Sequence, residues 1–263
     1  MNHPLPSLLL ILSLLLSACA APTAAPVIPP FTASAAAATT APLPTVKPTA
    51  AITPSPMPVS EPPNPGALSA EQRQALDAAA RSYINPTPEG ALAAAIDLGY
   101  IGRNANPATM CGPLALAILQ KAGIVDPSLS LVSFYYLNPR SGHDERYLEQ
   151  VFPPERFEKI VRGESIKTID YNTDPLYPGD FLYLFAGDSG SFEHMLVVSR
   201  VDETGRAYAV TNLNTPDGVI VDEVMLYDPA NPGEGQFYEW TDWENRMIGR
   251  TGYGGFWLWR PLP

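Results

Sequence analysis

The chain has 263 residues, 30 of them proline, and a formal net charge of −11 at pH 7. This surplus of acid argues against nucleic acid or an anionic lipid surface as a partner, because both repel a negatively charged protein. Many of the prolines fall between residues 22 and 65, so the composition separates an N-terminal spacer from a folded part.

Residues 1–19 read as an export signal. Residues 8–16 are an apolar run too short to span a bilayer as a helix. The run ends in Leu16-Ser17-Ala18-Cys19, which resembles the bacterial lipoprotein box, although no Lys or Arg precedes it. We therefore expect a lipid on Cys19 to anchor the protein on the outer face of a membrane. An ordinary cleaved signal peptide with a fortuitous cysteine is the alternative.

Residues 20–68 are rich in Ala, Pro, Thr and Ser, with few charged or aromatic side chains. Such a segment buries too little apolar surface to fold, so the sequence predicts a disordered linker here. Residues 69–263 have the length of an ordinary single-core domain.

The folded part begins with helical patterns. Ser69 and Gln72 form a capping-box pattern for a helix through about Tyr83, and Pro88 opens a second helix over residues 90–98. A third helix follows Cys111, and residues 128–136 and 144–151 mix helix and turn. The strands expected after these helices cover residues 181–185, 195–201, 208–211, 219–221, 224–227 and 256–259. The predicted helices precede the predicted antiparallel strands along the chain, which is the pattern of an α+β fold.

The stretch around Cys111 leads from a polar loop directly into an apolar helix. Gly112 permits a sharp turn, Pro113 suits the first helical turn, and Gly123 is placed to end the helix. Cys111 therefore sits at the N-terminus of a buried helix, where the helix dipole favours a thiolate. If Cys19 carries a lipid, Cys111 has no disulfide partner, which indicates a reactive thiol. A small buried hydrophobic side chain is the simpler alternative.

A nucleophilic cysteine needs a base and a group that orients the base. The folded part offers two histidines: His143 in a polar run, and His194 at the mouth of an apolar strand. A tight turn after that strand would bring Asn212 opposite or diagonal to His194, and a turn one residue longer would bring Asn214 there. Either amide is a candidate to fix the tautomer of the imidazole.

Three motifs resemble papain-like bacterial thiol hydrolases: Met110-Cys-Gly-Pro-Leu-Ala-Leu-Ala-Ile-Leu119, Pro178-Gly-Asp180, and His194-Met-Leu-Val-Val198. The first is most similar to the double-glycine leader peptidases and their stand-alone relatives. The Pro-Gly-Asp strand also resembles that of CHAP amidases and NlpC-type peptidases. The resemblance implies a papain-like α+β fold, with the cysteine-bearing helix packed on an antiparallel sheet. It further implies Cys111 as nucleophile, His194 as base and Asn212 as orienting residue.

The chain departs from this family where an oxyanion donor is expected. Those peptidases usually carry a Gln shortly before the cysteine, whereas this chain offers Asn106 and Asn104. The expected function is an extracytoplasmic, membrane-anchored cysteine peptidase or amidase, acting through a thioester without metal or cofactor. Its substrate would be a peptide, a protein or a peptidoglycan stem peptide.

Two alternatives stay open at this point. One is a catalytically inactive surface-binding lipoprotein on the same scaffold, since fold does not guarantee chemistry. The other concerns the C-terminal aromatic residues, which either line a substrate groove or pack the edge of the sheet. They are Trp240, Trp243, Tyr253, Phe256, Trp257 and Trp259.

Overall fold

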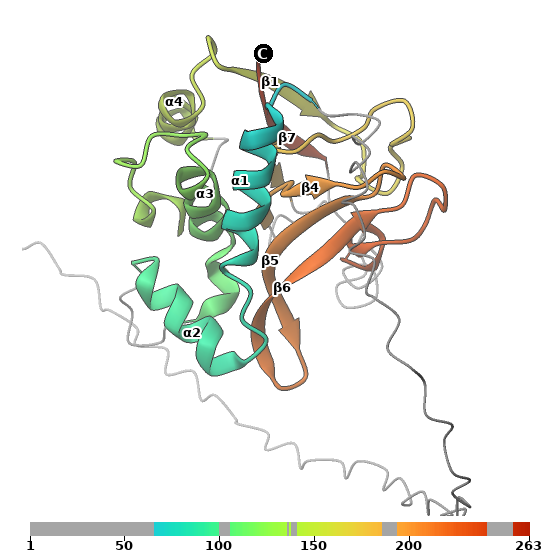
Figure 1. The fold of residues 1–263 in the computed structure, drawn as a ribbon. Helices are drawn as coiled ribbons and strands as arrows, with labels where there is room; N and C mark the ends of the chain where they lie inside the picture. The colour runs from blue at the N-terminus through green and yellow to red at the C-terminus, as the bar shows by residue number, and fades with distance from the viewer. Residues whose placement is uncertain (1–65, 100–105, 136, 138–140, 186–193, 241–254) are drawn as a thin grey trace, which may run out of the picture. The chain divides into compact units, whose positions relative to one another are not determined.

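The structure is a computed structural model, and it describes residues 66–99, 106–135, 137, 141–185, 194–240 and 255–263. These residues lie within one compact unit, Pro56–Pro263. Helices pack against antiparallel strands, so the predicted α+β class is confirmed (Figure 1).

The helices follow the pattern read from the sequence. They are α1 (Ala70–Arg81), α2 (Pro88–Asp97), α3 (Cys111–Lys121) and α4 (Gly142–Val151), with 3₁₀ turns η1 (Pro107–Thr109) and η2 (Val132–Tyr135). The capping box of α1 is confirmed: Ser69 Oγ accepts from the Gln72 amide at 3.2 Å, and Gln72 Oε1 accepts from the Ser69 amide at 2.9 Å. Pro88 opens α2 as predicted.

Helix α3 is buried from Cys111 through Leu119. Its last residue is Lys121, and Gly123 follows just after the C-cap with a φ of 70°, which only glycine adopts readily. The Gly123 amide donates to the Gln120 carbonyl at 3.0 Å, and the Ile124 amide donates to the Leu119 carbonyl at 2.9 Å. This is a Schellman motif, which fixes the helix terminus where the sequence predicts it.

The described strands form two antiparallel sheets. They are β1 (Phe157–Arg162), β2 (Phe181–Leu184), β3 (His194–Val197), β4 (Arg200–Val201), β5 (Ala207–Thr215), β6 (Gly218–Tyr227) and β7 (Phe256–Pro261). One sheet has the order β1-β7-β2-β3 and the other β4-β5-β6. The strand predicted over residues 195–201 is thus split between the two sheets. The two strands predicted over residues 219–221 and 224–227 form the single strand β6, and β1 was not predicted.

The split falls at Val198 and Ser199. There the Ser199 amide and hydroxyl both donate to the Tyr208 carbonyl, at 2.8 and 3.1 Å, while Arg200 is the paired residue of Tyr208. Two successive residues therefore face one partner, which bends the chain from one sheet into the other.

Alternating side chains of β2 pack into two different hydrophobic cores. Phe181 and Tyr183 belong to the core under the helices, and Leu182 and Leu184 belong to the core shared by the two sheets. The four-stranded sheet therefore has a helix side and a sheet side, and this distinction decides which functional side chains meet.

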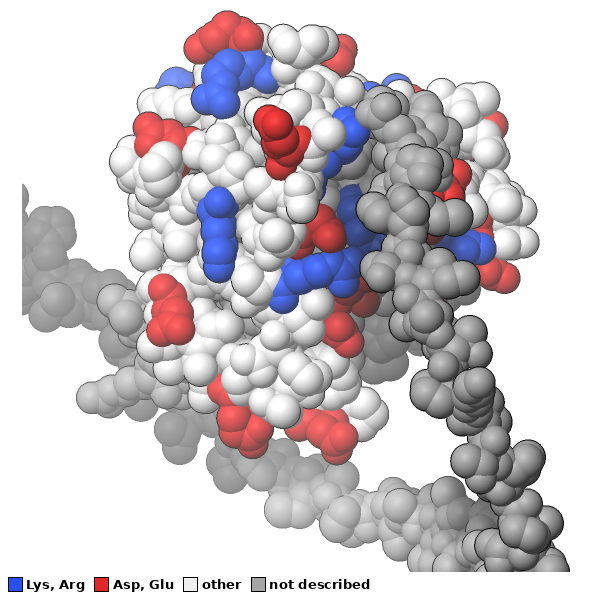
Figure 2. Space-filling view, viewed as in Figure 1, with Lys and Arg blue, Asp and Glu red and all other residues white. Residues whose placement is uncertain are grey.

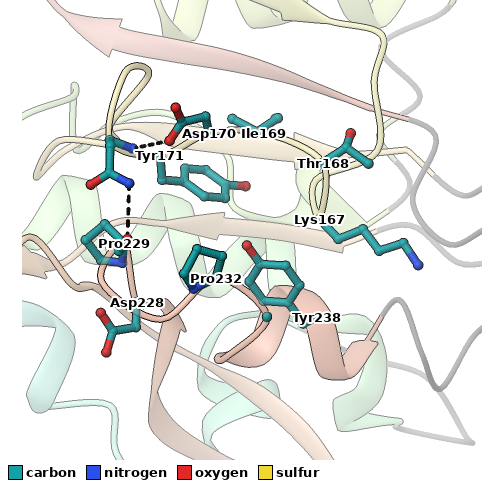
Figure 3. A pocket seen from close by; sticks show the side chains of 11 residues that line it. Lys167, Thr168, Ile169, Asp170, Tyr171, Asp228, Pro229, Pro232 and Tyr238 are labelled. Carbon is teal, nitrogen blue, oxygen red and sulfur yellow. Dashed lines mark hydrogen bonds between the residues drawn. The ribbon is translucent and has the colours of Figure 1, made fainter.

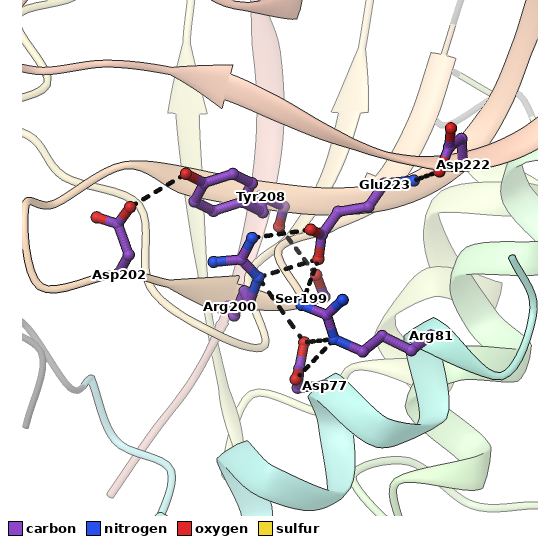
Figure 4. A network of polar contacts seen from close by, with 8 residues as sticks. All are labelled: Asp77, Arg81, Ser199, Arg200, Asp202, Tyr208, Asp222 and Glu223. Atoms are coloured by element: carbon purple, nitrogen blue, oxygen red, sulfur yellow. Dashed lines mark hydrogen bonds and ion pairs between the residues drawn. The ribbon is translucent and has the colours of Figure 1, made fainter. Parts of the chain in front are cut away.

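An ion-pair network ties α1 to the three-stranded sheet (Figure 4). Glu223 of β6 accepts from Arg200 at 2.8 and 3.0 Å and pairs with Arg81 of α1 at 3.0 Å. The Arg200 guanidinium also lies 3.5 Å from the Tyr208 ring centroid. On the face seen in Figure 2, acidic and basic side chains are interspersed.

Candidate functional site

Cys111 is the first residue of α3, and 7% of its surface is exposed. It is a thiol and not half of a disulfide. Met110, which precedes it, provides no side-chain cap for the helix. The free amide groups of the first turn, and with them the positive end of the helix dipole, therefore lie at the end of α3 that carries Cys111.

Gly112 brings the start of α3 into contact with β3. A Cβ atom at this position would lie 2.7 Å from the Phe134 carbonyl oxygen and 2.7 and 2.8 Å from Cε and Sδ of Met195. Only glycine permits this approach. Cys111 and His194 are the chain neighbours of the two residues that touch, Gly112 and Met195, so the predicted nucleophile and base lie in adjoining segments.

Gly112→Ala is expected to destabilise the protein by about 1–3 kcal/mol, because the Phe134 carbonyl belongs to the backbone and cannot move aside easily. Urea denaturation at pH 7 would measure the change. Gly163→Ala is the matched control, since a Cβ there meets nothing within 4 Å. Equal stabilities for the two variants would contradict the tight contact between α3 and β3.

His194 is buried at the first position of β3, with 5% of its surface exposed. Its Nε2 lies 2.8 Å from the hydroxyl oxygen of Thr211, and its ring centroid lies 4.7 Å from that of Trp240 in an edge-to-face arrangement. Burial lowers the pKa of His194 from 6.5 to about 4. The imidazole is therefore neutral at pH 7, as a general base must be.

The side chain of His194 points to the sheet side. It pairs with Leu184, which belongs to the core between the sheets, whereas the next residue, Met195, belongs to the core under the helices. Among the described residues, the polar and ring contacts of His194 are with Thr211 and Trp240. The structure thus places the segments of Cys111 and His194 against each other.

The structure bonds Asn212 to the turn before Cys111, whereas the prediction pairs it with His194. Its side-chain amide donates to the carbonyls of Pro107 and Ala108, at 3.2 and 2.9 Å, in the turn that precedes Cys111. The prediction assumed an unbroken strand from Met195 to Val201. The bend at Val198 and Ser199 shifts the register, and Thr211 takes the place beside His194.

The other predicted residues lie apart from His194 or outside the described residues. Asn214 is exposed on β5 opposite Val219. Asn106 is exposed and caps η1, where its side-chain oxygen accepts from the Ala108 amide at 3.0 Å. His143 is exposed and bonds to the neighbouring Asp144. Asn104 and Cys19 lie outside the described residues.

Sequence reasoning missed Thr211, because a threonine in a strand is an ordinary β-branched residue and gives no local signal. Among the aromatic candidates that the structure describes, Trp240 contacts a predicted site residue, His194. Trp259 is buried against Phe152, with ring centroids 5.5 Å apart, and Trp257 packs edge-to-face on Phe185. Packing of the sheet therefore accounts for these two; Trp243 and Tyr253 lie outside the described residues.

A separate cavity of about 450 Å³ opens between the loops that contain Tyr171 and Pro229 (Figure 3). The Asn172 side-chain amide donates to the Pro229 carbonyl at 3.1 Å and joins its walls. The cavity is lined by Pro232 and Tyr238 among others, and by none of the predicted site residues.

Comparison of the chain with protein-family models, curated proteins and solved structures finds no match. In the described part of the chain, no group of three or more His, Cys, Asp and Glu side chains is placed to hold a metal ion. No described helix has the length and apolarity needed to cross a membrane.

Proposed function

We propose that the protein is an extracytoplasmic thiol hydrolase of papain-like fold, anchored to a membrane through a lipid on Cys19. The proposal rests chiefly on the contact between Gly112 and Met195. This contact sets a cysteine at a helix N-terminus beside the strand that begins with a neutral, buried histidine. The expected substrates are amide bonds of peptides, proteins or peptidoglycan stem peptides.

In the proposed reaction, the Cys111 thiol gives its proton to His194 as the sulfur attacks the substrate carbonyl. The imidazolium then protonates the leaving amine, the C–N bond breaks, and a thioester remains on Cys111. Water, deprotonated by His194, hydrolyses the thioester and restores the thiol. The Cys111 backbone amide is the proposed oxyanion donor, with Asn106 or Asn104 as a second donor. An amine in place of water would make the same enzyme an acyltransferase.

This chemistry requires the imidazole to reach toward Cys111. His194 is the first described residue of β3. Nδ1 is the nitrogen that would receive the proton, since Nε2 lies against Thr211.

A non-catalytic binding lipoprotein is the second candidate, and the orientation of His194 favours it. A histidine held on the sheet side by Thr211 and Trp240 is what a purely structural residue would look like. In that case Cys111 would be a buried structural thiol.

Alkylation of Cys111 distinguishes the two candidates. The full mature chain, its His194→Gln variant and its Cys111→Ser variant would be pulsed with iodoacetamide at pH 6 to 7 and analysed by mass spectrometry. We expect labelling at Cys111 to slow by at least about tenfold in His194→Gln if the histidine activates the thiol. Slow labelling, equal in wild type and His194→Gln, would favour the binding protein, and circular dichroism would verify that each variant is folded.

A further inference from the structure

We propose that β5 holds both halves of the candidate site through two consecutive residues: Asn212 positions the loop of Cys111, and Thr211 orients His194. The inference rests on the proposed thiol hydrolase function and deepens it. It also reverses the expectation from the papain-like resemblance, in which the asparagine holds the histidine.

Asn212 is built as an anchor for the turn before the nucleophile. The side chain is buried, with 6% of the residue's surface exposed, and its amide nitrogen donates to two successive carbonyls of η1, those of Pro107 and Ala108. A three-residue 3₁₀ turn has little stability of its own. The amide of Asn212 links this turn to β5 across more than 100 residues of sequence, and Cys111 follows the turn by two residues.

Thr211 is placed to orient the ring of His194. It is 1% exposed, and its hydroxyl oxygen is the hydrogen-bond partner of Nε2. When Nε2–H donates to this oxygen, Nδ1 carries the lone pair and is the nitrogen able to accept a proton. Thr211 thus does for His194 what the sequence assigned to Asn212.

The two roles follow from the geometry of a strand, in which successive side chains point to opposite faces. Val210 belongs to the core under the helices and Ala209 to the core between the sheets. By the same alternation, Asn212 faces the helix side and Thr211 the sheet side. Pairing of Thr211 with Asp222 and of Asn212 with Val221 fixes this register, and Val221 is itself bonded to Asn85 at 2.8 and 2.9 Å.

The test uses the full mature chain with substitutions at each position. The variants are Asn212→Ala, Asn212→Asp, Thr211→Val and Thr211→Ser. Two readouts are measured on each: the ¹⁵N NMR signals of the His194 ring, which report the protonated nitrogen, and the pH midpoint of Cys111 alkylation by iodoacetamide. Asn212→Asp matters because it keeps the shape of the side chain and removes the donor.

We expect substitutions at Asn212 and at Thr211 to change different readouts. Both Asn212 variants should raise the alkylation midpoint by about one pH unit toward that of a free thiol, which lowers the rate at pH 6 by about tenfold. They should leave the His194 tautomer unchanged. Thr211→Val should convert His194 to a mixture of tautomers, and Thr211→Ser, which keeps the hydroxyl, should restore the wild-type spectrum.

A change of His194 tautomer in Asn212→Ala, with none in Thr211→Val, would overturn the inference and restore the papain-type assignment. Wild-type midpoints in both Asn212 variants would also overturn it. The test is separate from that of the proposed function: if His194→Gln leaves alkylation unchanged, the hydrolase proposal falls, whereas the anchoring by Asn212 is still decided by its own variants.

Discussion

Asp180→Ala is expected to lower the free energy of unfolding by about 3 kcal/mol, because it leaves the partly buried guanidinium of Arg260 without its counter-ion. Asp180 is fully buried and accepts from Arg260 Nε at 2.9 Å and from Arg260 Nη2 at 2.7 Å. Its carboxylate also accepts from the Tyr177 amide at 2.8 Å. The Pro-Gly-Asp motif thus serves here to fasten the C-terminal strand β7, which carries Arg260.

The pair itself contributes less than its removal would suggest. Burial raises the pKa of Asp180 even though Arg260 opposes the change, so desolvation of the carboxylate outweighs the attraction. We therefore expect Asp180→Leu combined with Arg260→Met to recover most of the stability lost in Asp180→Ala. Urea denaturation at pH 7 would measure all three proteins.

Asp174→Ala is the matched control for a surface pair, since Asp174 bonds to Arg162 with side chains 46% and 31% exposed. It should cost at most about 1 kcal/mol. A comparable loss in Asp174→Ala and Asp180→Ala would refute the special role of the buried pair.

Acidification below about pH 6.5 should destabilise the protein through His194. The pKa of His194 is about 4 in the folded protein against 6.5 for an ordinary histidine, so the unfolded chain binds a proton that the folded protein rejects. The free energy of unfolding should therefore fall as the pH is lowered from 6.5 toward 4, by about 1.4 kcal/mol per pH unit. Above pH 6.5 His194 contributes no slope.

His194→Gln should remove this slope while keeping a polar side chain beside Thr211. Urea denaturation of both proteins between pH 7 and pH 4.5 would test this. The window avoids the buried Asp228, whose pKa Arg206 and Asn231 lower to about 2. If the free energy of unfolding fell equally with pH in wild type and in His194→Gln, His194 would not be held neutral in the folded protein.

Local signals in the sequence predict most of the helical part of the fold. The capping box at Ser69, the proline at residue 88 and the glycine at residue 123 each act within one helical turn, so no tertiary information is needed to read them. Strand β1 escaped prediction because it lies at a sheet edge, where only Phe157 is buried and the alternation is faint.

The candidate site is less predictable, because it depends on register. The sequence indicates Cys111 at a helix start and His194 at a strand start, and the structure has both there. Which residue of β5 meets His194 depends on the bend at Ser199, where the chain changes sheets. That bend results from packing between distant strands, so Thr211 lies where Asn212 was expected.

The change of sheet between β3 and β4 also bears on how this domain can be engineered. The turn at Glu203 and Thr204 joins β4 to β5, whereas β3 is held by β2 and most of β5 by β6. Both turn residues are exposed. A fluorophore-binding tag or an epitope inserted there should therefore leave the contact between Thr211 and His194 undisturbed, and the turn is a suitable attachment point for reporters.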